Sequence, residues 1–330
     1  MLEHGGRLRL AALQYGIALP DWLDLSTGIA PYGWALPDIP ASAWQRLPEP
    51  EDGLEAAARD YYGCSSLLAV AGSQAAIQAL PRLRRRSVVG MLALAYAEHA
   101  AAWRRHGHKL LSFSEASINR AIDRLDVLVL VNPNNPTGRL IEPEQLLAWH
   151  ARLAERGGWL VVDEAFIDCT PEQSLARFSH LRGLIVLRSF GKFFAMAGAR
   201  LGFVLAQQPL LEGLTEMLGP WPISGPTRVM ATALLRDFEG QSAQRQRLLT
   251  DSQRLGELLA NQGLPALGGC SLFQWVATER ASLLHGCLAN QGILLRYFQQ
   301  PESLRFGLPA DESGWQRLAI ALERFNESLG

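Results

Sequence analysis

Cysteine is scarce in this sequence, and its cysteines are not paired by spacing. The four of them are scattered along 330 residues: Cys64, Cys169, Cys270 and Cys287. None belongs to a Cys-x-x-Cys pair, so the sequence offers neither a disulfide framework nor the ligand spacing of a zinc site. The one close histidine pair, His106 and His108, has no further ligand nearby. We therefore expect no bound metal, and a protein of the reducing cytoplasm.

Long hydrophobic runs and an excess of charge are also missing. No apolar run approaches the roughly eighteen residues of a membrane span, and residues 1–7 lack the apolar core of a secretory signal peptide. The 31 Lys and Arg residues nearly balance the 32 Asp and Glu residues, for a net charge of −1 at pH 7. Such a balance argues against nucleic acid or a membrane surface as the main partner. We expect a cytoplasmic globular protein that acts on a small molecule.

Short apolar runs alternate with amphipathic helices from about residue 52 onward. The runs occupy residues 67–70, 88–92, 109–113, 127–131, 159–162, 184–187 and 201–205. Alternation of this kind is the signature of a parallel sheet with crossover helices. The unbroken Val/Leu run 127–131 is typical of a strand buried on both faces. The pattern predicts an α/β fold.

Composition divides the chain into three segments. Residues 1–41 are rich in Gly and Pro and are predicted to form an irregular arm, packed with a small C-terminal domain. Residues 42–225 hold the alternating pattern and are predicted to form a large domain that carries the functional site. From Pro226 a helical stretch runs to about Gln262, and strand-like segments interleaved with helices follow. This predicts a smaller α+β domain over residues 226–330.

Polar residues follow five of the apolar runs, at the position where ligands bind in open α/β sheets. They are Gly72-Ser73, Tyr96, Asn135, Asp163, and Ser189 with Lys192. Each alone has a structural explanation: Ser73 as a helix N-cap, Asn135 as a turn residue and Asp163 as a cap. Tyr96 suits the edge of a core, and Lys192 suits a solvated loop. The five together, with a lysine among them, indicate a single site.

This set suits an aldehyde cofactor, pyridoxal 5′-phosphate. Lys192, predicted to lie in a loop just past a buried strand, would form a Schiff base with it and later move protons. Asp163 beside the ring nitrogen would keep that nitrogen protonated, which makes the ring an electron sink. Tyr96 would cover the ring face, and Asn135 would donate a hydrogen bond to the ring oxygen.

The phosphate of this cofactor has predicted contacts of its own. The helix N-terminus at Gly72, Ser73 and Gln74 would offer backbone N–H groups and a positive dipole end. Ser189 and Arg200 would add a hydroxyl and a cation. The alternative for Arg200 is an ordinary surface charge.

Three motifs resemble, in order and spacing, the signatures of the class I and II aminotransferase family of fold-type I pyridoxal-phosphate enzymes. They are Asn132-Pro133-Asn134-Asn135-Pro136-Thr137-Gly138, Asp163-Glu164-Ala165-Phe166, and Ser189-Phe190-Gly191-Lys192 followed by Arg200. The resemblance covers nearly the whole chain. It implies a mostly parallel seven-stranded sheet between helices, a smaller α+β domain and a homodimer. It also implies that Phe166 contacts the cofactor.

Within this family the chain is similar to the histidinol-phosphate aminotransferases and, more closely, to the threonine-phosphate decarboxylases of cobalamin biosynthesis. The second branch is favoured by His4-Gly5-Gly6, by residues 24–29, and by Phe166, where the aminotransferases usually have tyrosine. The resemblance implies decarboxylation of L-threonine O-3-phosphate to (R)-1-aminopropan-2-ol O-phosphate. Transamination of histidinol phosphate or a related phosphorylated amino compound is the alternative. A non-catalytic scaffold is a third reading, which the joint presence of the cofactor residues argues against.

The decarboxylase branch also implies a set of substrate contacts. They are His4, Gly5, Gly6, Thr27, Gly28, Asn135, Arg296 and Arg305. Two arginines suit a substrate with two anionic groups, a carboxylate and a phosphate. The alternatives are a surface histidine for His4 and a surface ion pair for Arg296.

Three positions depart from the family pattern. Gly191 stands where the family often has serine before the lysine, which leaves Ser189 and Arg200 to hold the cofactor phosphate. Leu47 stands where relatives place a tyrosine that reaches a partner subunit's cofactor, so one phosphate contact is lost. Ala30 replaces the usual asparagine of the arm, which changes the expected details of substrate contact.

Overall fold

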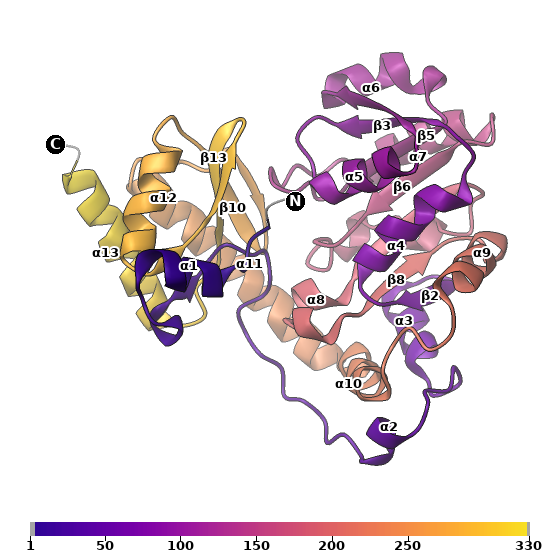
Figure 1. The fold of residues 1–330 in the computed structure, drawn as a ribbon, viewed down its shortest axis with the longest axis horizontal. Helices are drawn as coiled ribbons and strands as arrows, with labels where there is room; N and C mark the ends of the chain where they lie inside the picture. Colours follow the sequence, from indigo (N-terminus) through magenta and orange to yellow (C-terminus); the bar gives the residue numbers. More distant parts are fainter. Residues whose placement is uncertain (1–3, 329–330) are drawn as a thin grey trace. The chain divides into compact units, whose positions relative to one another are not determined.

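The structure, a computed structural model, describes residues 4–328. The chain separates into two compact units (Figure 1). The large unit comprises Trp34–Asn135 and Leu140–Arg245, and the small unit comprises, within the described residues, 4–33, Pro136–Arg139 and 246–328.

A seven-stranded sheet forms the centre of the large unit. Its strands, in spatial order, are β2 (Leu67–Val70), β8 (Gly202–Leu205), β7 (Leu184–Ser189), β6 (Trp159–Asp163), β5 (Val127–Val131), β3 (Val88–Leu92) and β4 (Lys109–Phe113). β8 runs antiparallel to both of its neighbours, and the remaining pairs are parallel. The predicted α/β fold with a mostly parallel sheet is confirmed. β3, β4 and β5 begin and end at the predicted residues.

Helices bury the apolar side chains of this sheet. Every residue of β5 is buried, which accounts for its unbroken Val/Leu sequence. One face packs against α4 (Ser73–Ala79), α5 (Ala97–Arg105) and α9 (Gln208–Leu218), through side chains such as Ile77, Trp103 and Leu211. Burial of each such side chain contributes roughly 1.5–3 kcal/mol. Helix α7 (Pro143–Ala154) begins at Pro143, joins β5 to β6 and contacts β6.

The remaining helices of the large unit lie around these elements. They are α2 (Ser42–Gln45), α3 (Leu54–Tyr62), α6 (Glu115–Ala121), α8 (Phe190–Phe193) and α10 (Gly225–Arg236). α10 packs against α2 and α3, and α3 contacts the edge strand β2.

The strand directions bring six carboxyl ends to one edge of the sheet. β3, β4, β5, β6 and β7 are mutually parallel. β2 shares their direction because β8 is antiparallel to both β2 and β7. For the same reason β8 begins at this edge. Ligands of open α/β sheets bind beyond the carboxyl ends of the strands, and the predicted polar residues follow these ends.

A four-stranded antiparallel sheet forms the core of the small unit. Its order is β12 (Arg296–Gln299), β13 (Glu302–Gly307), β10 (Phe273–Ala277) and β9 (Gly268–Cys270). Helices α12 (Ala281–Asn290) and α13 (Glu312–Glu327) pack against each other. The turn Pro136–Arg139 belongs to this unit because Gly138 lies against Gly269, where a Cβ on Gly138 would come within 2.2 Å of the backbone.

The N-terminal segment is partly regular, which corrects the prediction of an irregular arm. It contains the helix α1 (Leu8–Tyr15) and the strand β1 (Leu23–Asp24), which pairs in parallel with β11 (Ile293–Leu294). The helix forms because residues 8, 11, 12 and 15 share one face. That face packs with Trp22 and Ala289.

Two further predictions differ from the structure. The helical stretch from Pro226 to Gln262 is two helices, α10 and α11 (Phe238–Asn261). The break falls at Asp237, which leaves the helical conformation and accepts the backbone N–H of Gly240 on its side chain. The units divide after residues 33 and 245 and not after 41 and 225, since α10 packs on α3 in the large unit.

Among residues 4–328, no helix is both long enough and apolar enough to cross a membrane. The same residues hold no group of three His, Cys, Asp or Glu side chains that could bind a metal ion. All four cysteines are free thiols.

Candidate active site

Lys192 lies on the short helix α8, directly after β7. The sequence predicted a loop here, which is wrong. Phe190 and Phe193, at 0% and 1% exposure, anchor one helical turn in the core. Lys192 itself is half-buried, and its Nζ lies 5.8 Å from the centroid of the Phe166 ring. The amino group therefore lies beside an aromatic ring, three residues after Ser189, the last residue of β7.

Asp163 is the last residue of β6, and its side chain is buried. Its Oδ1 accepts the backbone N–H of Ala165 at 3.2 Å, and its Oδ2 lies 2.9 Å from Nε2 of His99. Both carboxylate oxygens are therefore held by neighbours. Sequence reasoning missed His99, although the spacing carried a signal. His99 on α5 follows Tyr96 by three residues, which places both on one side of the helix start.

Tyr96 precedes α5 and is half-buried beside this pair. The rings of Tyr96 and His99 meet edge to face, with 6.2 Å between their centroids. The Tyr96 hydroxyl donates to Oε1 of Gln74 at 3.5 Å, and Nε2 of Gln74 donates to Glu98 at 2.9 Å. Burial, followed by the charges of Glu98 and Asp163, raises the pKa of Tyr96 to about 12. The phenol is therefore neutral at physiological pH.

Arg200 lies against the start of α4. Gly72, with φ of +74°, precedes this helix, and a Cβ there would lie 2.6 Å from Nη2 of Arg200. Gly202 is equally close to the helix, because a Cβ on it would lie 2.5 Å from the backbone N of Ser73. Gly202 also pairs with Ser189 across β8 and β7. The structure thus brings the start of α4, Ser189 and Arg200 together.

The turn after β5 places Asn135 at the same edge, where it is half-buried. Asn132 closes the turn, since its Nδ2 donates to the carbonyl of Ile141 at 3.0 Å and its Oδ1 accepts the Ile141 N–H at 2.7 Å. Nδ2 of Asn134 donates to the carbonyl of Leu94 at 2.9 Å. These bonds fix the backbone on either side of Asn135.

These residues of the large unit fit pyridoxal 5′-phosphate. A phosphate dianion needs a cation and N–H donors, and Arg200 lies at the start of α4, where Gly72 leaves room for it. A protonated ring nitrogen needs a buried carboxylate, as Asp163 is. Lys192 supplies the amine. The one other lysine of the sequence, Lys109, begins β4 at the opposite edge of the sheet.

The small unit brings the N-terminal glycines next to Arg305. The N–H of Gly6 donates to Oγ of Ser26 at 2.7 Å, and a Cβ on Gly5 would lie 2.2 Å from the carbonyl oxygen of Ser26. That same carbonyl accepts a hydrogen bond from Nη2 of Arg305 at 2.9 Å. Thr27 lies alongside, because a Cβ on Gly307 would lie 2.6 Å from its carbonyl oxygen. The segments around residues 5 and 26 and the strand β13 therefore meet, although about 280 residues separate Ser26 from Arg305.

Arg305 and Arg296 face each other directly across the β12–β13 pair. Arg305 is buried, with its guanidinium carbon 5.0 Å from the centroid of the Phe273 ring. Burial lowers the pKa of Arg305 to about 10, so it is a cation at physiological pH. Arg296 is half-buried. Two cations thus lie side by side. Of the other predicted substrate contacts, His4 is exposed and Gly28 is buried.

The three departures from the family pattern have different structural settings. A Cβ on Gly191 would lie 2.8 Å from Cα of Ala197, so the backbone here leaves no room for a larger residue. Ala30 is buried, at 2% exposure, whereas Leu47 is 63% exposed.

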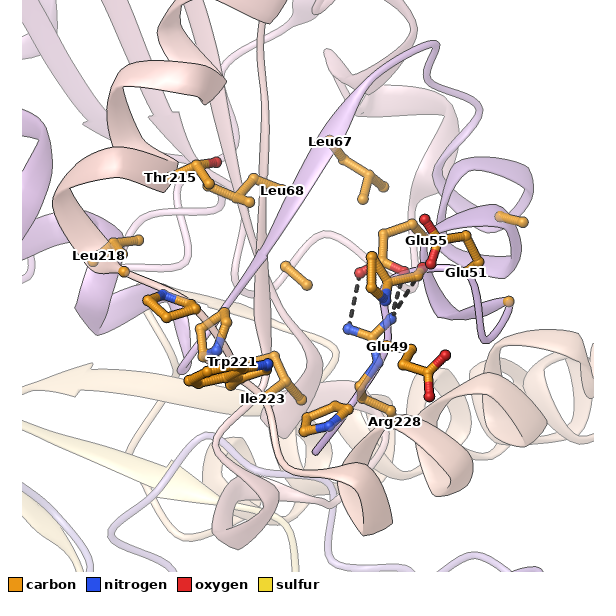
Figure 2. Close-up of a pocket in the computed structure, with 18 of the residues that line it drawn as sticks. Glu49, Glu51, Glu55, Leu67, Leu68, Thr215, Leu218, Trp221, Ile223 and Arg228 are labelled. Atoms are coloured by element: carbon orange, nitrogen blue, oxygen red, sulfur yellow. Dashed lines mark hydrogen bonds and ion pairs between the residues drawn. The ribbon is translucent and has the colours of Figure 1, made fainter. Parts of the chain in front are cut away.

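A cavity of about 650 Å³ lies elsewhere in the large unit (Figure 2). Its walls come from α3, β2, the end of α9 and residues 219–223, and none of the predicted site residues lines it. Arg228, on one wall, points toward Glu55 (Figure 2), to which its Nη2 donates at 2.6 Å. The apolar part includes Leu67, Leu68 and the exposed ring of Trp221.

Comparison with known proteins gives concordant matches. The family model for aminotransferase class I and II matches residues 21–323. A threonine-phosphate decarboxylase from Pseudomonas aeruginosa is 62% identical over 327 residues, which cover 99% of either chain. A threonine-phosphate decarboxylase from a Sinorhizobium species is 43% identical and covers 98% of either chain.

The fold has matches among solved structures. A histidinol-phosphate aminotransferase from Sinorhizobium meliloti, in complex with pyridoxal-5′-phosphate, aligns with a TM-score of 0.84. The alignment covers 100% of this chain and 96% of that one, at 20% identity. At this identity the likeness bears on the fold alone.

Proposed function

The chain belongs to the class I and II aminotransferase family, and we propose that it decarboxylates L-threonine O-3-phosphate to (R)-1-aminopropan-2-ol O-phosphate. The cofactor is pyridoxal 5′-phosphate. The observation that carries the reaction is 62% identity over nearly the whole chain with a threonine-phosphate decarboxylase. The geometry at Lys192, Asp163 and Arg200 supports the cofactor.

Pyridoxal 5′-phosphate, when bound, supplies an aldehyde for the substrate amine and a ring that accepts electrons from the Cα of the substrate. Arg200, Ser189 and the N–H groups at the start of α4 would hold its phosphate. Asp163 would keep the proton on the ring nitrogen, with His99 fixing the carboxylate. Tyr96, a neutral phenol, would cover the ring.

Substrate orientation decides which bond at Cα breaks. In the proposed reaction the Cα–carboxylate bond breaks, CO2 leaves, and a proton takes its place on Cα. Lys192 or a water molecule delivers that proton. Arg296 and Arg305 provide two cations for the two anionic groups of phosphothreonine, and the Gly5–Ser26 contact holds the N-terminal segment beside Arg305.

We further propose that the protein is a cytoplasmic homodimer that serves cobalamin biosynthesis. Five large apolar side chains of the large unit are exposed: Leu36, Trp44, Leu47, Trp221 and Phe238. A second copy that covered these side chains would remove their apolar surface from water, which favours association. Light scattering on the purified protein tests the dimer, and a monomer at micromolar concentration contradicts it.

The reaction is tested by incubating purified protein with pyridoxal 5′-phosphate and phosphothreonine and measuring CO2. We expect CO2 from the wild type and from Lys109→Ala, and none from Lys192→Ala. Borohydride reduction followed by peptide mass spectrometry should place the cofactor on Lys192 alone. Absence of CO2, together with amino transfer between histidinol phosphate and 2-oxoglutarate, would replace the decarboxylase by the aminotransferase. A wild type that takes up no cofactor would contradict both.

A further inference from the structure

The residues next to Asp163 and Ser189 in the chain meet each other. Arg188 precedes Ser189, and Glu164 follows Asp163. Consecutive side chains of a strand point to opposite faces, so these neighbours face away from the site residues. The backbone N–H of Glu164 donates to the carbonyl of Leu187 at 2.9 Å. This hydrogen bond joins the carboxyl ends of β6 and β7.

The guanidinium of Arg188 binds two carboxylates at once. Nη1 donates to Oε2 of Glu164 at 3.0 Å, and Nη2 donates to Oδ1 of Asp168 at 2.7 Å. The three side chains are exposed by 4% or less. Ser174 donates from its hydroxyl to Glu164 at 2.5 Å, and Tyr61 donates to Asp168 at 2.9 Å. The segment after β6 is therefore tied to β7 by charge-assisted hydrogen bonds.

Helix α11 contributes a second connection. Nε of Arg245 donates to the carbonyl of Asp168 at 2.8 Å, and its guanidinium carbon lies 5.5 Å from the centroid of the Phe193 ring. Nε2 of Gln244 donates to the carbonyl of Phe193, the residue after Lys192, at 3.1 Å. The network thus contacts the chain neighbours of Asp163, Ser189 and Lys192 at three separate points.

The charges in this network are compensated by one another. Burial alone lowers the pKa of Arg188, but Asp168 and Glu164 outweigh it and raise that pKa above its ordinary value. Arg188 is thus a permanent cation. Buried ion pairs often add less stability than apolar side chains of the same volume, and their best-attested use is to specify geometry. A planar guanidinium that holds two carboxylates fixes both distance and direction.

We propose that Arg188 is a positioning residue. It sets the placement of Asp163, Ser189 and Lys192 by holding the strand ends of β6 and β7 from the opposite side of the sheet. The inference rests on the proposed function, because it concerns residues assigned to the cofactor. It assigns Arg188 no contact with cofactor or substrate.

The test compares Arg188→Lys with a matched control, Arg228→Lys. Arg228 is a similarly buried arginine of the large unit, with 6% of its side chain exposed, and it also holds two carboxylates, Asp52 and Glu55. It lines the cavity of Figure 2, which contains none of the cofactor residues. Both variants keep the positive charge and lose the bidentate geometry.

For each variant we measure the thermal unfolding of the cofactor-free protein and the Kd of pyridoxal 5′-phosphate. The pH midpoint of the bound cofactor's absorption change is recorded as well.

We expect both variants to unfold at lower temperature. Arg188→Lys should also weaken cofactor binding about tenfold or more, because small misplacements of a binding group are costly. In Arg188→Lys the pH midpoint of the bound cofactor's absorption change should also shift. Arg228→Lys should retain the wild-type Kd and the wild-type pH midpoint. If Arg188→Lys loses as much thermal stability as Arg228→Lys but keeps the wild-type Kd and pH midpoint, Arg188 has only a structural role.

If Arg188→Lys does not fold, Glu164→Gln takes its place, with the same expectations. A wild type that binds no cofactor contradicts the proposed function, whereas a binding wild type with an unaffected Arg188→Lys contradicts only this inference.

Discussion

Nε2 of His99 lies 2.9 Å from Oδ2 of Asp163, with both side chains 4% exposed. Helix α5 thereby contacts the carboxyl end of β6. The Ala165 N–H donates to the other carboxylate oxygen. Together, His99 and this N–H fix the plane of the Asp163 carboxylate. If Asp163 binds the cofactor ring as proposed, a carboxylate that is already fixed would need no reorganisation when charge develops on that ring.

His99→Leu should weaken cofactor binding and lower kcat. The substitution removes the partner of a buried carboxylate oxygen, at a cost of about 1–3 kcal/mol. His99→Gln can keep a donor N–H near the same place and should retain more of both quantities. Fluorescence titration with pyridoxal 5′-phosphate and the rate of CO2 release are the measurements. Equal losses in the two variants would show that the hydrogen bond is unimportant.

Gly72→Ala should lower the affinity for pyridoxal 5′-phosphate. Its Cβ would lie 2.6 Å from Nη2 of Arg200 and push the guanidinium away from the start of α4. Gly107→Ala is the control, because Gly107 also has positive φ, at +79°, but nothing lies within 4 Å of its Cβ position. Both variants should lose stability, by about 1–3 kcal/mol, because a residue with a Cβ is strained at positive φ. If Gly107→Ala loses cofactor affinity to the same degree, the cause is strain and not displacement of Arg200.

Arg305→Lys should raise the KM for phosphothreonine more than it lowers kcat. Loss of a charge-assisted hydrogen bond costs about 1.5–3 kcal/mol, which is roughly a tenfold to hundredfold change in binding. The variant also weakens the contact with the Ser26 carbonyl that holds the N-terminal segment. Arg317→Lys, a change in an arginine that bonds the carbonyls of Gln291 and Gly292, is the control. Steady-state kinetics that show an unchanged KM for Arg305→Lys would remove this residue from the substrate site.

Asp52→Asn should lower thermal stability at pH 7 and have a smaller effect as pH falls below the unfolded pKa of the carboxyl. Burial would raise the pKa of Asp52, but hydrogen bonds from Arg228 and the Leu54 N–H outweigh it and lower that pKa below 3.8. Because the folded pKa is depressed, the ion pair stabilises the protein above the unfolded pKa and is lost as pH falls through the folded value. The partly exposed carboxylate should contribute about 1 kcal/mol. Unfolding curves of Asp52→Asn and the exposed control Asp38→Asn, from pH 7 to pH 3, measure it. A stability difference that does not change with pH contradicts the assignment.

The sequence by itself determined the strands, the order of the motifs and the family. Strands buried on both faces need continuous apolar residues, so residues 127–131 alone are enough to predict β5. Ligand residues in such a fold follow strand ends, which is why Asp163, Ser189 and Lys192 could be selected from their positions in the chain. The local form around Lys192 could not be predicted in this way, because two buried phenylalanines convert the predicted loop into a helical turn.

Only the tertiary structure decided which side chains meet. His99 and Asp163 are 64 residues apart, and Arg188 and Glu164 are 24 apart. The N-terminal glycines reach Arg305 through Ser26, 279 residues away from it. Periodicity reports which face of an element is buried, but not which element covers that face. Contacts between distant segments follow from sheet order, register and backbone proximity at glycines, and these exist only in the folded chain.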